Sequence, residues 1–142
     1  MKAVALLALL VAGGALAASD AVVARHQYIL NCAGCHQVDG RGAPTGDVPT
    51  LRGQLGHFLK LPEGRAFLVQ VPGTSNSALN NAEVTRLLNW MANAFSGDTL
   101  PADFTPYTEE EVTRYRSHPL EDVSATRAAI VASLAARGIT IK

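Results

Sequence analysis

The chain has 142 residues, of which 48% are hydrophobic and 17% are charged, and its 12 Lys and Arg are balanced by 12 Asp and Glu. This length predicts one domain, or one domain with an additional tail. The balanced charge argues against a nucleic-acid partner, because phosphate binding needs a basic surface. The hydrophobic fraction is too high for a disordered chain.

The N-terminus has the three parts of a secretory signal peptide. Met1-Lys2 is a short positive start, an uncharged run of about 14 residues follows, and Ala15-Leu16-Ala17 resembles a small-residue cleavage site. The apolar run is shorter than the roughly 20 residues that span a bilayer. We therefore predict a signal peptide at residues 1–17 and an exported mature chain with no membrane span. An uncleaved membrane anchor is the alternative.

Helical patterns dominate the rest of the sequence. Gly and Pro are frequent at residues 40–49 and again at 72–77, which predicts two long irregular loops between Cys35 and Ala82. The short apolar run at 67–71 has the length of a strand, but one strand cannot form a sheet. Helices are expected at residues 21–30, 82–94, 108–119 and 123–136. The sequence therefore predicts an all-α fold.

The two cysteines, Cys32 and Cys35, are followed directly by His36 and form a Cys-x-x-Cys-His motif. This is the attachment sequence for a c-type haem, in which the thiols bond to the vinyl groups and the imidazole binds the iron. A disulfide or thiol-redox pair is an alternative in an exported chain, and a zinc site is another, although zinc needs four ligands. The motif predicts one covalently bound haem c, held by Cys32 and Cys35, with His36 as the proximal iron ligand.

From about Val22 to Ala94 the sequence resembles a class I cytochrome c. Besides the motif, Pro49-Thr50-Leu51 resembles the Pro-x-Leu segment of that family, and Trp90 resembles the packing aromatic residue of its C-terminal helix. The resemblance implies a helical fold around one haem. It also implies that the Pro49 carbonyl accepts a hydrogen bond from His36, which fixes the tautomer of the iron ligand.

The second axial ligand departs from the family pattern. The family usually carries a Met in the loop before the C-terminal helix, where this chain has Val71-Pro72-Gly73. Met91 is the thioether that remains after removal of the signal, and it is either the distal iron ligand or a core residue. His57 is the alternative ligand, and a five-coordinate iron with an open distal site is a third arrangement. His26 and His118 are expected on the surface.

The chain continues beyond the length of a minimal class I cytochrome. We predict a haem domain at residues 18–96, after the signal peptide at 1–17, and a helical C-terminal extension at 97–142. Either the extension is strapped onto the haem domain or it docks a partner. The side chains that could strap it are Phe104, Tyr107, Tyr115 and Leu120.

The resemblance implies an electron-transfer protein rather than an enzyme. Such a mono-haem cytochrome would work in the periplasm and pass single electrons between redox proteins such as a dehydrogenase and a terminal oxidase. Its near-neutral charge suggests docking that is mainly apolar. The alternative function is a haem-binding sensor or catalytic haem protein, with an open distal site for a gas or a peroxide.

Overall fold

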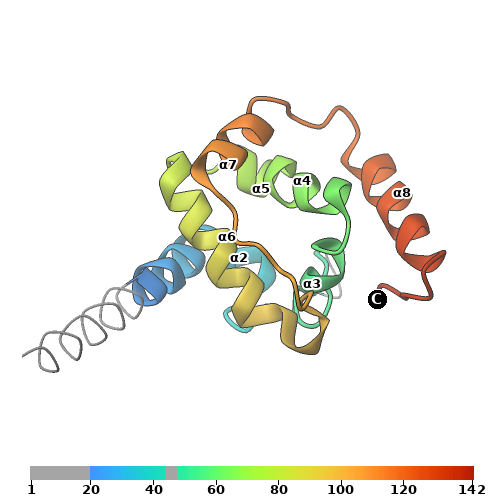
Figure 1. Ribbon diagram of the computed structural model, residues 1–142. Helices are drawn as coiled ribbons and strands as arrows, with labels where there is room; N and C mark the ends of the chain where they lie inside the picture. Colours follow the sequence, from blue (N-terminus) through green and yellow to red (C-terminus); the bar gives the residue numbers. More distant parts are fainter. Residues whose placement is uncertain (1–19, 44–47) are drawn as a thin grey trace, which may run out of the picture.

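The computed structural model describes residues 20–43 and 48–142, and the regular elements within them are helices (Figure 1). Residues 20–31 are helical, and the following elements are α2 (Ala33–His36), α3 (Leu55–Phe58), α4 (Pro62–Gln70), α5 (Pro72–Ser75), α6 (Asn81–Ser96), the 3-10 helix η1 (Gly97–Thr99), α7 (Glu109–Arg116) and α8 (Val123–Ala135). Within the described residues, β pairing is limited to one isolated bridge between Ala43 and Val48. The predicted all-α fold is confirmed. The predicted signal peptide lies outside the described residues.

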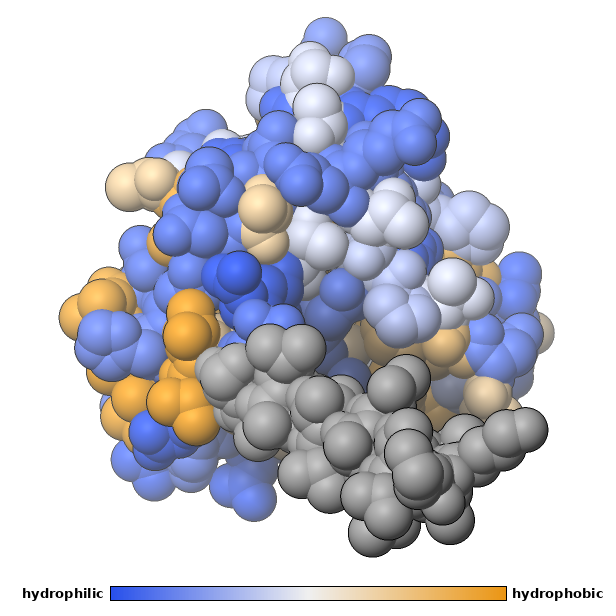
Figure 2. All heavy atoms as spheres, turned by 60° about the vertical axis from the view of Figure 1, so that its left-hand side comes forward, coloured by the Kyte–Doolittle hydropathy of each residue, from blue (hydrophilic) through white to orange (hydrophobic). Residues whose placement is uncertain are grey.

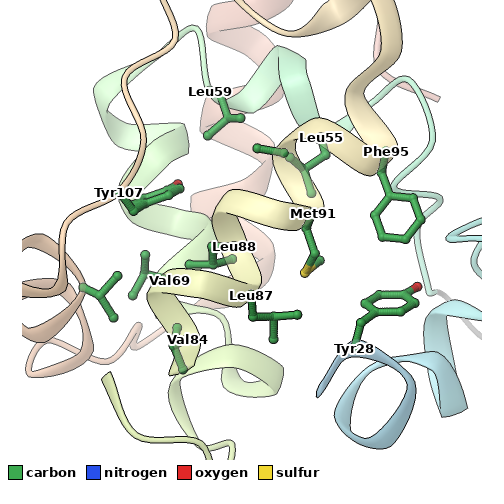
Figure 3. Close-up of a cluster of buried hydrophobic side chains, with 12 residues drawn as sticks. Tyr28, Leu55, Leu59, Val69, Val84, Leu87, Leu88, Met91, Phe95 and Tyr107 are labelled. Carbon is green, nitrogen blue, oxygen red and sulfur yellow. The ribbon is translucent and has the colours of Figure 1, made fainter. Parts of the chain in front are cut away.

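Helix α6 is the centre of the first core. Its N-terminus is fixed by a capping box: the Asn80 side chain accepts from the Glu83 N–H at 2.9 Å, and the Glu83 carboxylate accepts from the Asn80 N–H at 2.8 Å. Apolar residues then recur at helical spacing and face inwards. The buried members of this first apolar cluster are Tyr28, Leu55, Leu59, Val69, Val84, Leu87, Leu88, Met91, Ala92, Phe95, Tyr107 and Val112 (Figure 3).

Three aromatic rings join the N-terminal helical residues to α6. The centroid of the Tyr28 ring lies 5.5 Å from that of Trp90 and 4.9 Å from that of Phe95, and the Trp90 and Phe95 rings meet edge to face at 5.5 Å. Such tilted pairs stabilise a contact beyond their buried area. Trp90 therefore packs across the N-terminal helix, as the resemblance to class I cytochromes c implied.

The stretch between Cys35 and Ala82 is more helical than predicted, because α3, α4 and α5 occupy much of the two expected loops. Pro62 is the first residue of α4, where its missing N–H is tolerated, and Glu63 suits the first turn. Phe67 and Val69 belong to two different apolar clusters, since α4 lies between them. This two-sided burial removes the amphipathic period and explains why the run resembled a strand.

The extension is strapped onto the preceding helices rather than free. Tyr107 is buried in the first cluster, and Phe104 and Tyr115 pack against it half-buried. Helix α8 adds to a second apolar cluster, whose buried members are Phe58, Leu61, Phe67, Ile130 and Leu134, and Leu120 packs at its edge. Helix α7 contacts α4 and α6, whereas α8 contacts α3 and α4 and lies on the opposite side of the molecule from residues 20–31 (Figure 1).

Candidate haem-attachment site

The Cys-x-x-Cys-His motif forms a compact turn at the end of the N-terminal helical residues. The Cys32 N–H donates to the Tyr28 carbonyl at 2.8 Å, and the Cys32 carbonyl in turn accepts from the His36 N–H at 2.9 Å. Cys32 is half-buried against the first apolar cluster, whereas Cys35 is exposed. Both thiols and the imidazole thus lie within five consecutive residues of one helical turn, so a single flat group could contact all three.

The His36 ring is oriented by Pro49. Its Nδ1 lies 3.2 Å from the Pro49 carbonyl oxygen. Because a carbonyl can only accept a hydrogen bond, Nδ1 must carry the proton in this contact, and Nε2 then carries the free lone pair. Burial lowers the pKa of His36, although the bond to Pro49 opposes this effect. A neutral imidazole with a free Nε2 is the form that binds a metal ion.

A glycine, Gly42, allows the backbone at Pro49 to approach His36. Gly42 has φ +74, a left-handed conformation that favours glycine, and a Cβ there would collide with the Val48 carbonyl oxygen. Its N–H donates to the His36 carbonyl at 2.9 Å. Gly42 therefore holds the backbone of the motif and the backbone before Pro49 side by side.

Tyr28 supports the backbone that directly follows the motif, a role that was not predicted from the sequence. The Tyr28 hydroxyl donates to the Gln37 carbonyl at 2.7 Å, and Gln37 adopts a positive φ of 66° immediately after His36. Burial raises the pKa of Tyr28 to about 12, so the hydroxyl remains a donor. The signal was present, because Tyr28 precedes Cys32 by one helical turn and so faces the same side.

The Cys32 thiol lacks the acidity of a redox-active cysteine. Burial and the neighbouring Cys35 raise the pKa of Cys32 to about 11. Thiol oxidoreductases instead depend on a cysteine whose pKa is lowered by a helix terminus or a cation. This direction argues against the thiol-redox interpretation of the motif.

The two candidates for the second axial position lie in different surroundings. Met91 is 8% exposed, and its sulfur points into the space between Leu87 and Tyr28 in the first cluster (Figure 3). His57 lies on α3, and its buried Nδ1 has no hydrogen-bond partner among the described residues. Packing alone accounts for the position of the thioether, whereas a buried ring nitrogen normally needs a partner. His26 and His118 are exposed, as expected.

Apolar side chains reach the surface on both sides of the motif. Leu30, which precedes Cys32, is 68% exposed, and Val38, which follows His36, is 60% exposed. Figure 2 shows a face that is mostly hydrophilic, with strongly apolar surface next to the grey atoms. Exposed apolar side chains therefore flank the motif, and Asp39, next to Val38 in the sequence, forms an exposed ion pair with Arg52.

Comparison with known proteins identifies the family. The sequence model named Cytochrome c matches residues 21–95, which include the motif, Pro49 and α6 up to Phe95. The chain belongs to the cytochrome c family. Cytochromes c carry covalently attached haem c with its iron, and this protein therefore does so. The residues present fit this cofactor, since two thiols and an imidazole with a free Nε2 come from one turn.

Two relatives from Thermus thermophilus, each named cytochrome c-552, are both 32% identical to this cytochrome. The first aligns over 138 residues, covering 84% of this chain and 90% of its own length. The second aligns over 107 residues, covering 63% of this chain and 81% of its own length. No solved structure matches. Residues 97–142 are about a third of this cytochrome, so an alignment that covers 84% of it necessarily includes part of the extension.

No helix in residues 20–43 and 48–142 is both long and apolar enough to cross a membrane.

Proposed function

We propose that this cytochrome is an exported, periplasmic mono-haem electron carrier, and not itself an enzyme. It would accept single electrons from one redox protein, such as a dehydrogenase, and pass them to another, such as a terminal oxidase. The observation that carries the proposal is the hydrogen bond between His36 Nδ1 and the Pro49 carbonyl at 3.2 Å, beside two cysteines on the same turn. This arrangement presents one fixed imidazole nitrogen to the iron.

The chain's own residues have defined tasks in this proposal. The bound haem supplies an iron that cycles between the ferric and ferrous states. Cys32 and Cys35 hold the haem covalently, and His36 provides Nε2 as the proximal ligand. Pro49 fixes the tautomer of His36 and makes the imidazole a stronger donor. The first apolar cluster, against which Cys32 packs, excludes water from one side of the site.

The surface around the motif supports transient docking. The exposed side chains of Leu30 and Val38 flank the motif, and the whole chain has zero formal charge. Strong electrostatic steering requires a clearly charged surface. We therefore propose that redox partners dock on a small apolar surface next to the haem, which suits weak and short-lived electron-transfer complexes.

Optical spectra of the purified holoprotein test the proposal and assign the second axial ligand. We would compare wild type with Met91→Leu, which keeps the side-chain volume but removes the sulfur, and with His57→Gln. His118→Gln is the matched control, because His118 is exposed. A low-spin spectrum whose sulfur-to-iron charge-transfer band disappears in Met91→Leu assigns Met91. A low-spin spectrum that changes only in His57→Gln assigns His57.

The same samples decide between the carrier and the alternative function. An electron carrier should show a reversible one-electron couple, and the ferrous form should take up carbon monoxide slowly or not at all. A high-spin wild-type iron that binds carbon monoxide at once would contradict the carrier. It would instead favour a sensor or catalytic haem protein with an open distal site.

A further inference from the structure

Arg116, at the end of α7, binds a cluster of uncharged acceptors outside the motif. Its guanidinium is half-buried, and no carboxylate of residues 20–43 and 48–142 lies within ion-pair distance. Instead it donates to the Ser75 carbonyl at 2.9 Å, the Leu79 carbonyl at 2.9 Å and the Ser77 carbonyl at 3.2 Å. It also donates to the Asn81 side-chain oxygen at 2.9 Å. One cation thus binds several acceptors of a single short segment.

These acceptors belong to the connection between α5 and α6, which we define as residues 75–81. Backbone carbonyls in an irregular segment lack the regular partners of a helix or a sheet and must find other donors. The planar guanidinium offers five N–H donors in a fixed geometry, and Lys, with three donors on a flexible stem, cannot reproduce it. Arg116 therefore holds the α5–α6 connection in one shape.

Helix α7 is a firm support for this arginine. Thr113, one turn before Arg116, accepts a hydrogen bond from the Asn81 side chain at 2.8 Å. Glu111 forms an ion pair with Arg65 of α4 at 2.6 Å, and both side chains are less than one-fifth exposed. The helix is thus fixed to α4 on one side and to the α5–α6 connection on the other.

The α5–α6 connection borders the same apolar cluster as the attachment motif. Leu79, whose carbonyl Arg116 binds, packs its side chain against the cluster, and so does Cys32. A haem bonded to Cys32 would therefore lie against the same cluster as Leu79. The connection contains only Ser, Asn, Ala and Leu, and it has no sulfur or imidazole that could bind iron. Contacts from outside must keep it in place.

We propose that Arg116 is a positioning residue of the haem site: by binding the α5–α6 connection it keeps external ligands from reaching the iron. The C-terminal extension would then control access to the haem as well as add to the fold. This inference rests on the proposed haem attachment at Cys32, Cys35 and His36.

The test compares the full-length holoproteins of wild type, Arg116→Ala, Arg116→Lys and Arg114→Ala. Arg114 is the matched control because it is exposed, lies on the same helix, and stacks over the ring of Tyr115 at 5.1 Å rather than on the α5–α6 connection. The readouts are the rate at which carbon monoxide binds the ferrous protein and the hydrogen exchange of amides 75–81. Neither readout depends on a redox partner.

Arg116→Ala should bind carbon monoxide about tenfold faster or more, since losing several charge-assisted hydrogen bonds makes opening of the connection easier. Amides 75–81 should exchange faster in parallel, Arg116→Lys should lie between, and Arg114→Ala should stay within about twofold of wild type. An unchanged rate in Arg116→Ala would overturn the proposal, whether or not the amides exchange faster. If Arg116→Ala does not accumulate as folded holoprotein, Arg116→Lys decides by the same criteria. Failure of the proposed function would appear separately, in the wild type alone, as a high-spin iron that binds carbon monoxide at once.

Discussion

Helices α7 and α8 follow each other in the extension but are attached differently, because α7 adds many polar contacts to its buried Val112. Helix α7 is fixed by the Arg65–Glu111 ion pair and by the hydrogen bonds of Arg116. Just before the helix, the Asn89 side chain accepts from the Tyr107 N–H at 2.7 Å and donates to the Tyr107 carbonyl at 3.0 Å. Helix α8 is attached by buried apolar residues, above all Ile130 and Leu134. Directional polar contacts define one exact position, whereas apolar burial stabilises in proportion to area and tolerates shifts. The extension therefore has one positioning helix and one covering helix.

The largest effect should come from the apolar attachment. Leu134 is 0% exposed in the second cluster, so Leu134→Ala should lower the free energy of unfolding by about 2–5 kcal/mol. Urea unfolding at low and high salt would measure the loss, which should not depend on salt. Leu134→Met is the control of similar volume and should cost less than about 1.5 kcal/mol. A loss from Leu134→Ala no greater than from Leu134→Met would mean that α8 does not rely on this packing.

The second-largest loss of stability should come from the polar attachment of α7. In Glu111→Gln, Arg65 keeps its bond to the Thr105 carbonyl at 2.8 Å and its stacking on Tyr107, but it loses the carboxylate. We expect a loss of roughly 1.5–3 kcal/mol, the range for hydrogen bonds to charged groups. Calorimetric or urea unfolding checks it, with the exposed neighbour in Glu110→Gln expected within about 0.5 kcal/mol of wild type. Equal effects at the two positions would show that the ion pair does not hold α7.

The two helices share one feature, a side-chain cap, which should respond alike in both. Thr108 accepts from the Glu111 N–H at 3.2 Å, and Asp122 accepts from the Ala125 N–H at 2.8 Å. Thr108→Ala and Asp122→Ala should each cost about 1 kcal/mol of stability, measured by urea unfolding. Thr108→Ser, which retains the hydroxyl, should restore most of the loss. A much larger effect in one helix would indicate that its cap also takes part in its attachment.

The smallest effect on stability should come from breaking an exposed ion pair. Its comparison with the buried Arg65–Glu111 pair shows how much burial contributes. Arg52 and Asp39 lie 3.3 Å apart, but their side chains are 61% and 47% exposed. Arg52→Ala should therefore change stability by only about 0–1 kcal/mol, and less at high salt. Thermal unfolding at two salt concentrations tests this. A loss as large as that in Glu111→Gln would remove the distinction between buried and exposed pairs.

Much of this fold could be predicted from local signals. Helices α6, α7 and α8 were expected close to their observed bounds, because capping residues precede α6 and α7 and Gly138 follows α8. Helix α4 was missed because its apolar residues face two clusters, a consequence of tertiary packing that no local period shows. Its signal was Pro62 followed by Glu63, which marks a helix start.

The haem site likewise contains features that could be predicted from the sequence and features that could not. The motif was expected because the chemistry of attachment requires fixed spacing. The contact between His36 and Pro49 was expected from the resemblance to class I cytochromes c, and the structure shows it. The role of Arg116 was not expected, since its acceptors lie 35 or more positions away in the sequence and are mostly backbone carbonyls. Backbone acceptors have no side-chain signature, and only the folded chain brings them to the guanidinium.

Contacts between residues that are far apart in the sequence also affect how the chain folds. The Lys142 N–H donates to the Gln54 side chain at 3.0 Å across 88 positions, and Arg65 reaches Glu111 across 46. Closing such long loops costs entropy before any contact is gained, so folding should be slow. The cysteines of the motif lie in a local turn, far in the sequence from Glu111 and Lys142. Before these distant contacts form, Cys32 and Cys35 therefore belong to a chain that is still open and leaves both thiols accessible.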